Sequence, residues 1–84
     1  MQNYPNPFNP ATVIKYSVKE NAHIQLRVFD MLGREVATLL DEQKPAGTYT
    51  INFDAAAAGL SSGAYFYTIK AGDFVKTKKM ILLK

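Results

Sequence analysis

The fold is decided by the stretch Leu60-Ser61-Ser62-Gly63-Ala64-Tyr65-Phe66-Tyr67-Thr68-Ile69. Within it, Tyr65, Tyr67 and Ile69 recur with the period of two that places one face of a β-strand in a core. Gly63 stands shortly before them, and glycine tolerates the backbone angles of a turn. The stretch therefore predicts a strand that begins at a turn and buries Tyr65, Tyr67 and Ile69.

The same alternation recurs along the chain, and no segment has the apolar spacing of an amphipathic helix. Strands are predicted around Ile14, Tyr16 and Val18, around Ile24, Leu26 and Val28, over residues 36–40, around Tyr49, Ile51 and Phe53, and over residues 74–83. Turn-forming residues separate these runs at 19–21, 30–33, 43–47 and 71–73. Together with the strand around Tyr67, they make six predicted strands.

Two segments depart from this alternation. Tyr4-Pro5-Asn6-Pro7-Phe8-Asn9-Pro10 has three prolines, which fix φ and remove backbone donors, so it predicts an extended edge segment and a seventh strand. The four alanines from Ala55 to Ala58 are too few for a lasting helix. We predict a crossover loop over residues 54–59, with one helical or 3₁₀ turn capped by Asp54 and ended by Gly59.

These elements indicate a fold class. About seven short strands separated by frequent turns favour two packed sheets, because a sheet that is apolar on one face must cover that face. Leu60, Gly63 and Tyr65 also fit a tyrosine corner, in which a tyrosine hydroxyl bonds to upstream backbone. We predict an all-β fold, an immunoglobulin-like β-sandwich of about seven antiparallel strands. A partly open barrel is the alternative.

The composition fits one folded domain. The chain has 84 residues, of which 48% are hydrophobic, and it contains no cysteine for disulfides or thiolate chemistry. No apolar run approaches the roughly 20 residues that span a bilayer, so no stable membrane insertion is predicted. Residues 1–10 lack the features of a signal peptide, and any export signal is expected elsewhere.

The positive charge is concentrated near the C-terminus. From Lys70 onward, five lysines stand against Asp73, a net charge of +4, whereas residues 1–69 sum to −1. Such a segment can bind a polyanion by counterion release, or it can block edge-to-edge pairing of strands. Edge protection is the more economical interpretation, and a nucleic-acid partner is not predicted because exposed aromatic residues are not interleaved with the lysines.

The sequence offers no catalytic arrangement. His23 is the single histidine, and the alternation places it on a polar strand face with Gln25 and Arg27, away from Ser61 and Ser62. The acids lack the spacing of a calcium loop, and no phosphate-binding glycine motif occurs. We predict that the domain is not an enzyme and has no metal or cofactor.

Two aromatic residues have the wrong parity for the core. Phe29 and Phe66 are predicted to be partly exposed and are candidate contact residues. They motivate one alternative function, an immunoglobulin-like carbohydrate-binding or adhesive module of a secreted enzyme.

Four pieces of the chain, in this order, resemble one family. They are Tyr4-Pro5-Asn6-Pro7-Phe8-Asn9-Pro10 with Thr12, Phe29-Asp30-Met31-Leu32-Gly33-Arg34-Glu35-Val36, Ala46-Gly47-Thr48-Tyr49 leading to Phe53-Asp54, and Leu60-Ser61-Ser62-Gly63-Ala64-Tyr65-Phe66-Tyr67 with the ending Lys79-Met80-Ile81-Leu82-Leu83-Lys84. The match resembles the type A C-terminal sorting domain of the type IX (Por) secretion system. Extra alanines before Leu60 depart from the family's pattern and lengthen the crossover loop.

The resemblance implies a secretion signal in the form of a folded domain with an immunoglobulin-like fold. Residues 1–84 would be a single C-terminal sorting domain, excised from a longer secreted protein. It would direct its N-terminal passenger domain from the periplasm across the bacterial outer membrane to the cell surface or beyond. The implied partners are the type IX machinery and a surface transpeptidase that removes the domain, and we expect a monomer. A weaker resemblance to an immunoglobulin-like domain of flagellar hook-capping proteins leaves a structural assembly role as another alternative.

In that family the closing strand carries much of the signal. The predicted recognition residues are Lys78, Lys79, Met80, Ile81, Leu82, Leu83 and Lys84. Met80 and Leu82 face one way and Ile81 and Leu83 the other, so one pair can pack inward and leave the other to a receptor. Burial of both pairs is the alternative.

Overall fold

The computed structural model describes residues 3–4 and 11–83, and every regular element in them is a β-strand. The strands are β1 (Asn3–Tyr4), β2 (Ala11–Val18), β3 (Ala22–Phe29), β4 (Glu35–Lys44), β5 (Gly47–Asp54), β6 (Gly63–Ala71) and β7 (Phe74–Leu82). They confirm the predicted all-β class. The segment predicted as an extended edge contributes Tyr4 to β1, and its residues 5–10 lie outside the described residues.

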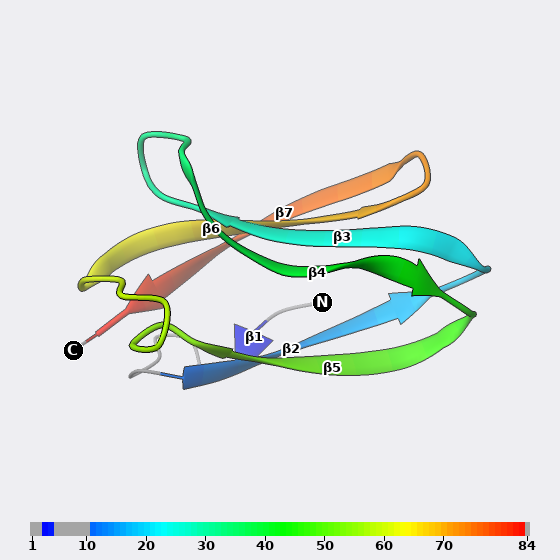
Figure 1. The fold of residues 1–84 in the computed structure, drawn as a ribbon, viewed down its shortest axis with the longest axis horizontal. Coiled ribbons are helices and arrows are strands. Elements are labelled where there is room, and N and C mark those ends of the chain that lie inside the picture. Colours follow the sequence, from blue (N-terminus) through cyan, green and yellow to red (C-terminus); the bar gives the residue numbers. More distant parts are fainter. Residues whose placement is uncertain (1–2, 5–10, 84) are drawn as a thin grey trace.

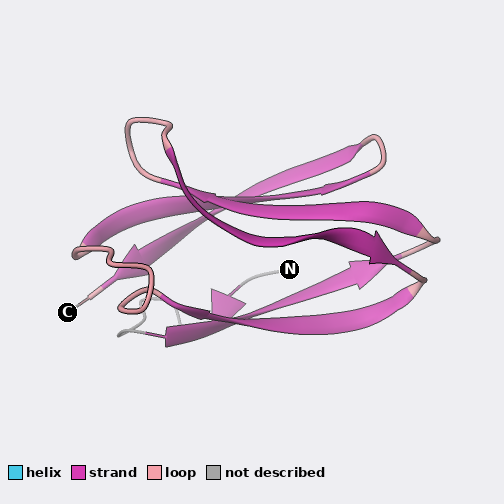
Figure 2. Cartoon of the chain, viewed as in Figure 1, coloured by secondary structure: helices cyan, strands magenta, loops and turns pink. Residues whose placement is uncertain are grey.

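The described strands form two antiparallel sheets that lie face to face (Figures 1 and 2). One sheet has the order β1-β2-β5 and the other the order β4-β3-β6-β7. The chain passes between the sheets from β2 to β3, from β4 to β5 and from β5 to β6. This topology is that of an immunoglobulin-like sandwich and confirms the predicted fold class. No described strand pairs across the two sheets, as the barrel alternative would require.

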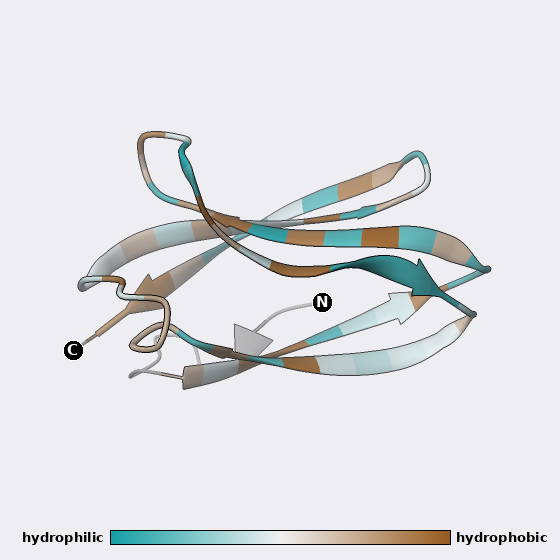
Figure 3. Cartoon of the chain, in the orientation of Figure 1, coloured by the Kyte–Doolittle hydropathy of each residue, from teal (hydrophilic) through white to brown (hydrophobic). Residues whose placement is uncertain are grey.

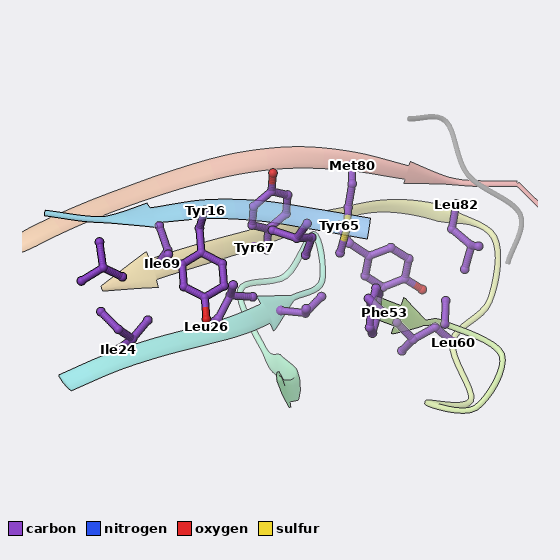
Figure 4. Packing of buried hydrophobic residues seen from close by; sticks show 14 residues of the cluster. Tyr16, Ile24, Leu26, Phe53, Leu60, Tyr65, Tyr67, Ile69, Met80 and Leu82 are labelled. Atoms are coloured by element: carbon purple, nitrogen blue, oxygen red, sulfur yellow. The ribbon is translucent and has the colours of Figure 1, made fainter. Parts of the chain in front are cut away.

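The core lies between the sheets and is built from alternate residues of the interior strands (Figure 4). The inward residues of β2, β3 and β6 are Ile14, Tyr16 and Val18, then Ile24, Leu26 and Val28, then Tyr65, Tyr67 and Ile69. All nine are buried, as the alternation predicts. The bands of opposite hydropathy along β3 in Figure 3 show the same period of two.

The strand β4 differs from its prediction. The apolar residues predict a strand over 36–40 and a turn over 43–47, but β4 continues to Lys44. Its polar end pairs through the backbone with the start of β3, where Ala22 lies opposite Lys44. Side-chain patterns miss such a strand end because it lies at a sheet edge, where polar side chains remain in water. The prediction of a turn at residues 43 and 44 was therefore wrong.

The tyrosine corner is confirmed. The Tyr65 hydroxyl donates to the backbone carbonyl of Ser61 at 2.7 Å. This bond ties the start of β6 to the loop that precedes it and orients the Tyr65 ring into the core, where it is buried.

The crossover loop between β5 and β6 contains the predicted capped turn. The Asp54 carboxylate accepts the backbone N–H groups of Ala56 at 3.0 Å and Ala57 at 3.2 Å, as an N-cap does. The backbone N–H of Leu60 donates to the Ala55 carbonyl at 3.0 Å, and Gly59 has a φ of 73°. This is a glycine-ended helical turn, so the four alanines fold locally without forming a longer helix.

The turn between β3 and β4 is organised by Asp30. Its carboxylate accepts the backbone N–H of Leu32 at 2.9 Å, the backbone N–H of Arg34 at 3.0 Å and the Arg34 Nε–H at 2.9 Å. These bonds, with that from the Arg34 backbone first, hold the pKa of the Asp30 carboxyl below its usual value. The turn is thereby fixed, and the side chains of Met31 and Leu32 are left exposed at its tip.

Replacing Asp30 by asparagine is expected to remove a pH-dependent part of the stability. A carboxyl whose pKa is lower in the folded chain stabilises the fold fully above its unfolded-state pKa of about 3.9, and this contribution is lost as the pH falls through the folded-state pKa. The urea midpoint of the wild type should exceed that of Asp30→Asn near neutral pH, and the difference should shrink below about pH 4. A difference that stays constant over this range would contradict a role for the charge.

Candidate functional site

The candidate site is β7, which lies at one edge of the four-stranded sheet. Among the described strands β7 pairs only with β6, from Ala71 opposite Phe74 to Gly63 opposite Leu82. The predicted recognition residues 78–83 fall in the second half of this strand and directly after it, and Lys84 lies outside the described residues. The first half of β7 forms a hairpin with the end of β6 (Figure 1).

The inward residues of β7 divide the strand into two halves. Met80 and Leu82 are 0% exposed and belong to the core, with Met80 directly opposite Tyr65. Lys78 and Lys76 have the same parity, but Lys78 is half-buried and Lys76 is exposed. Along β7 the apolar lining of the core therefore ends at Met80, whereas on β6 the core continues through Tyr67 and Ile69, opposite Lys78 and Lys76.

The outward residues of the second half are Lys79, Ile81 and Leu83. Lys79 is exposed, Ile81 is half-buried, and Leu83 is 53% exposed. The structure thus resolves the choice left by the sequence, because Met80 and Leu82 pack inward while Ile81 and Leu83 face away from the core. A receptor can reach the outward set without unfolding the domain, but it cannot reach Met80 or Leu82.

The strand register brings both outward aromatic residues into line with this set. Phe29 of β3 lies directly opposite Phe66 of β6, and Phe66 lies directly opposite Lys79 of β7. Both phenylalanines are half-buried on the outer face of the four-stranded sheet. A row Phe29–Phe66–Lys79 therefore crosses three strands, and Ile81 stands next to it along β7. A binding role for Phe29 and Phe66 stays a prediction.

The candidate catalytic residues are not brought together. His23 lies at the start of β3, and its ring makes an exposed side-chain hydrogen bond with the Asp41 carboxylate. Ser61 precedes β6, and β6 begins at the opposite end of the sheet, because Phe66 pairs with Phe29 and Ala71 with Ile24. The His23 contact lowers the pKa of the Asp41 carboxyl but does not orient the histidine toward a serine.

The described part of the chain also contains no cluster of three or more histidine, cysteine, aspartate or glutamate residues able to hold a metal ion. Within residues 3–4 and 11–83, no helix is long and apolar enough to cross a membrane.

The sequence reasoning missed one set of exposed apolar side chains. Met31 and Leu32 project from the β3–β4 turn, and Phe74 and Val75 follow the β6–β7 turn, all four more than half exposed. The available signal was their position beside turns, where a sandwich no longer has a facing sheet to cover apolar residues.

Comparisons with known proteins bear on this site. The family model described as "Secretion system C-terminal sorting domain" matches residues 2–83, which is nearly the whole chain. No curated protein matches this chain significantly. Among solved structures, the first immunoglobulin domain of mouse SynCAM 2 shares 15% identity, with 87% of this chain and 80% of that chain covered and a TM-score of 0.43.

Because the family match covers residues 2–83, the sorting function is favoured over a carbohydrate-binding or assembly module. The chain belongs to the secretion system C-terminal sorting domains, the signals that direct proteins through the type IX secretion system.

Proposed function

We propose that the secretion machinery reads the folded domain on the outer face of the four-stranded sheet, at the second half of β7. The observation that carries this proposal is the division of the strand. Met80 and Leu82 are fully buried, whereas Lys79 and Leu83 are exposed on the opposite face. The buried pair holds β7 in place, and the outward residues Lys79, Ile81 and Leu83 offer the contact.

The aromatic row extends this surface across the sheet. Phe66 and Phe29 continue the line from Lys79, so a receptor would meet a cation at the edge and apolar rings behind it. Aromatic and aliphatic side chains commonly form the central contacts of interfaces, with charged residues at the rim. Lys78, another predicted recognition residue, has the inward parity but is only half-buried, and it would add positive charge along the edge of the sheet.

The secretion route that we propose for the parent protein follows from the resemblance to the sorting-domain family. Family membership makes the parent a secreted protein bound for the cell surface or the extracellular space. Residues 1–84 would be the sorting domain of this longer protein, carry an N-terminal passenger through the periplasm, and be removed by a surface transpeptidase. The domain would act without catalysis of its own, which is supported by the separation of His23 from Ser61.

A monomer is the expected state of the domain. Lys76, Lys78 and Lys79 lie along β7, at the edge of the sheet. Like charges along such an edge oppose pairing with a second copy. The lysines would therefore protect the edge even where they do not contact a receptor.

The proposal is tested with a periplasmic reporter fused to this domain in a host that has the system. A variant with Lys79→Glu, Ile81→Ser and Leu83→Ser changes only outward positions. Its matched control carries Lys15→Glu, Val13→Ser and Ala11→Ser on the outward side of β2. Export of the first variant should fall at least about tenfold, the effect of losing one good interface contact.

The control should be exported like the wild type, and both variants should show a cooperative urea transition. Equal export by the β7 variant and the control would refute recognition through this face. Loss of export by both variants, with both folded, would refute the assignment to one sheet.

A further inference from the structure

Two separate apolar tips stand out on the surface of the described chain. One is the β3–β4 turn with Met31 and Leu32, where Leu32 is 78% exposed. The other is the β6–β7 hairpin end with Phe74 and Val75. We call these four residues the two-tip surface. Nothing in the sorting function assigns them a role.

Both tips rise on the same side of the molecule. Figures 1 and 2 show that the β3–β4 turn and the β6–β7 hairpin end both project on the side of the four-stranded sheet that faces away from the three-stranded sheet. They belong to opposite edges, β4 and β7, and to opposite ends of the strands. The twist of a sheet raises diagonally opposite corners to the same side, which accounts for this arrangement.

Positive charge lies directly behind the second tip. Lys70 is directly opposite Val75 on the outer face, and Lys76 follows Val75 along β7 on the other face of the hairpin, opposite Ile69. Both lysines are exposed, and neither forms an ion pair with another described residue. This is the basic end of the chain, with a net charge of +4 from Lys70 onward. The β6–β7 hairpin end thus combines two exposed apolar side chains, Phe74 and Val75, with two neighbouring lysines.

We propose that the two-tip surface docks reversibly on an anionic lipid surface. The apolar tips would enter the boundary between headgroups and acyl chains end first, where apolar side chains gain from burial, and Lys70 and Lys76, one on each face of the hairpin end, would lie at the level of the lipid phosphates. Two small tips at diagonally opposite corners of a sheet fit a continuous fluid surface better than a single protein groove, which needs one contiguous apolar patch. Because both tips face one way, the binding of one holds the other close to the membrane.

The contact is peripheral, and no part of the domain would cross the bilayer. It goes beyond reading of β7 by the secretion machinery, because it involves the first half of β7 and the β3–β4 turn. Its effect would be to hold the folded domain reversibly against a membrane by the outer face of the four-stranded sheet, and the domain would leave the membrane before the secretion machinery reads that face.

Sedimentation with vesicles tests this proposal on the 84-residue chain. Vesicles of phosphatidylcholine mixed with phosphatidylglycerol should bind the wild type, and vesicles of phosphatidylcholine alone should bind it much more weakly. Met31→Ser with Leu32→Ser, and separately Phe74→Ser with Val75→Ser, should each weaken binding at least about tenfold. Lys70→Gln with Lys76→Gln should weaken it roughly thirtyfold, at about fivefold per lysine.

Matched controls come from the other sheet. Val13 is an apolar residue 40% exposed on β2, and Lys15 is exposed beside it. Val13→Ser and Lys15→Gln should leave vesicle binding unchanged. Absence of binding to the anionic vesicles, or equal binding by the tip variants and the Val13→Ser control, would overturn the proposal.

Sedimentation velocity without lipid tests whether the tips instead contact a second copy of the domain. Self-association that the tip substitutions abolish, without vesicle binding by the wild type, would assign the tips to a second copy and overturn the lipid contact. The two proposals fail independently. Vesicle binding depends on residues 31, 32, 70 and 74–76, whereas the export test changes residues 79, 81 and 83.

Discussion

Replacing Leu82 by alanine is expected to lower the free energy of unfolding by about 3 kcal/mol, within the roughly 2–5 kcal/mol of buried leucine truncations. Leu82 is 0% exposed and lies at the end of β7, opposite Gly63. Glycine has no side chain to refill the space, so the cavity would persist. This is a large part of the stability of a domain of this size, which is about 4–13 kcal/mol.

The next residue supplies the control for Leu82. Leu83 has the same side chain but is 53% exposed, and its change to alanine should alter the free energy of unfolding by no more than about 0.5 kcal/mol. Urea denaturation followed by circular dichroism measures both. In the export assay, Leu82→Ala should fail in proportion to its unfolded fraction, whereas Leu83→Ala should lose export while folded. Equal losses of stability would show that β7 does not have the alternation described here.

The second large effect is expected at Tyr67. Its ring is fully buried in the middle of β6 and is among the largest buried side chains of the described core (Figure 4). Tyr67→Ala should cost about 3–5 kcal/mol, comparable to truncation of a buried phenylalanine. The lower end of the stability range for such a domain is no larger, so much of the protein is expected to unfold at physiological temperature.

Phe66 is the matched control for Tyr67, because it is adjacent in β6 but half-buried on the outer face. Phe66→Ala should cost less than half as much, since only part of its ring leaves water on folding. Thermal unfolding followed by near-ultraviolet circular dichroism measures the stability that each of the two variants loses. A larger loss for Phe66→Ala than for Tyr67→Ala would mean that the outer face is the better packed one.

Much of the fold could be predicted because interior strands carry a period of two. β2, β3 and β6 each have a strand on both sides and a core on one face, so their side chains must alternate. The edge strand β4 was harder to predict. β4 continues through Asp41, Glu42 and Gln43, whose side chains carry no apolar alternation, and only its backbone pairing with β3 defines it there.

The candidate site was predictable in sequence position but not in orientation. The alternation placed Met80 and Leu82 on one face and Ile81 and Leu83 on the other, but the core-facing pair depends on the register with β6, in which Tyr65 meets Met80. The alignment of Phe29, Phe66 and Lys79 depends on two registers at once. Such pairings come from backbone geometry between distant segments, which no local pattern contains.

The place of β7 in the chain also gives the domain a means of quality control. The inward side chains that complete the core, Met80 and Leu82, come from the last of the described strands to be synthesised. A chain that stops before Met80 lacks both of these inward side chains and leaves Tyr65 without its pairing residue on β7. The sorting domain can therefore complete its core only after translation has passed through Leu82. Prematurely terminated products would lack a folded sorting signal.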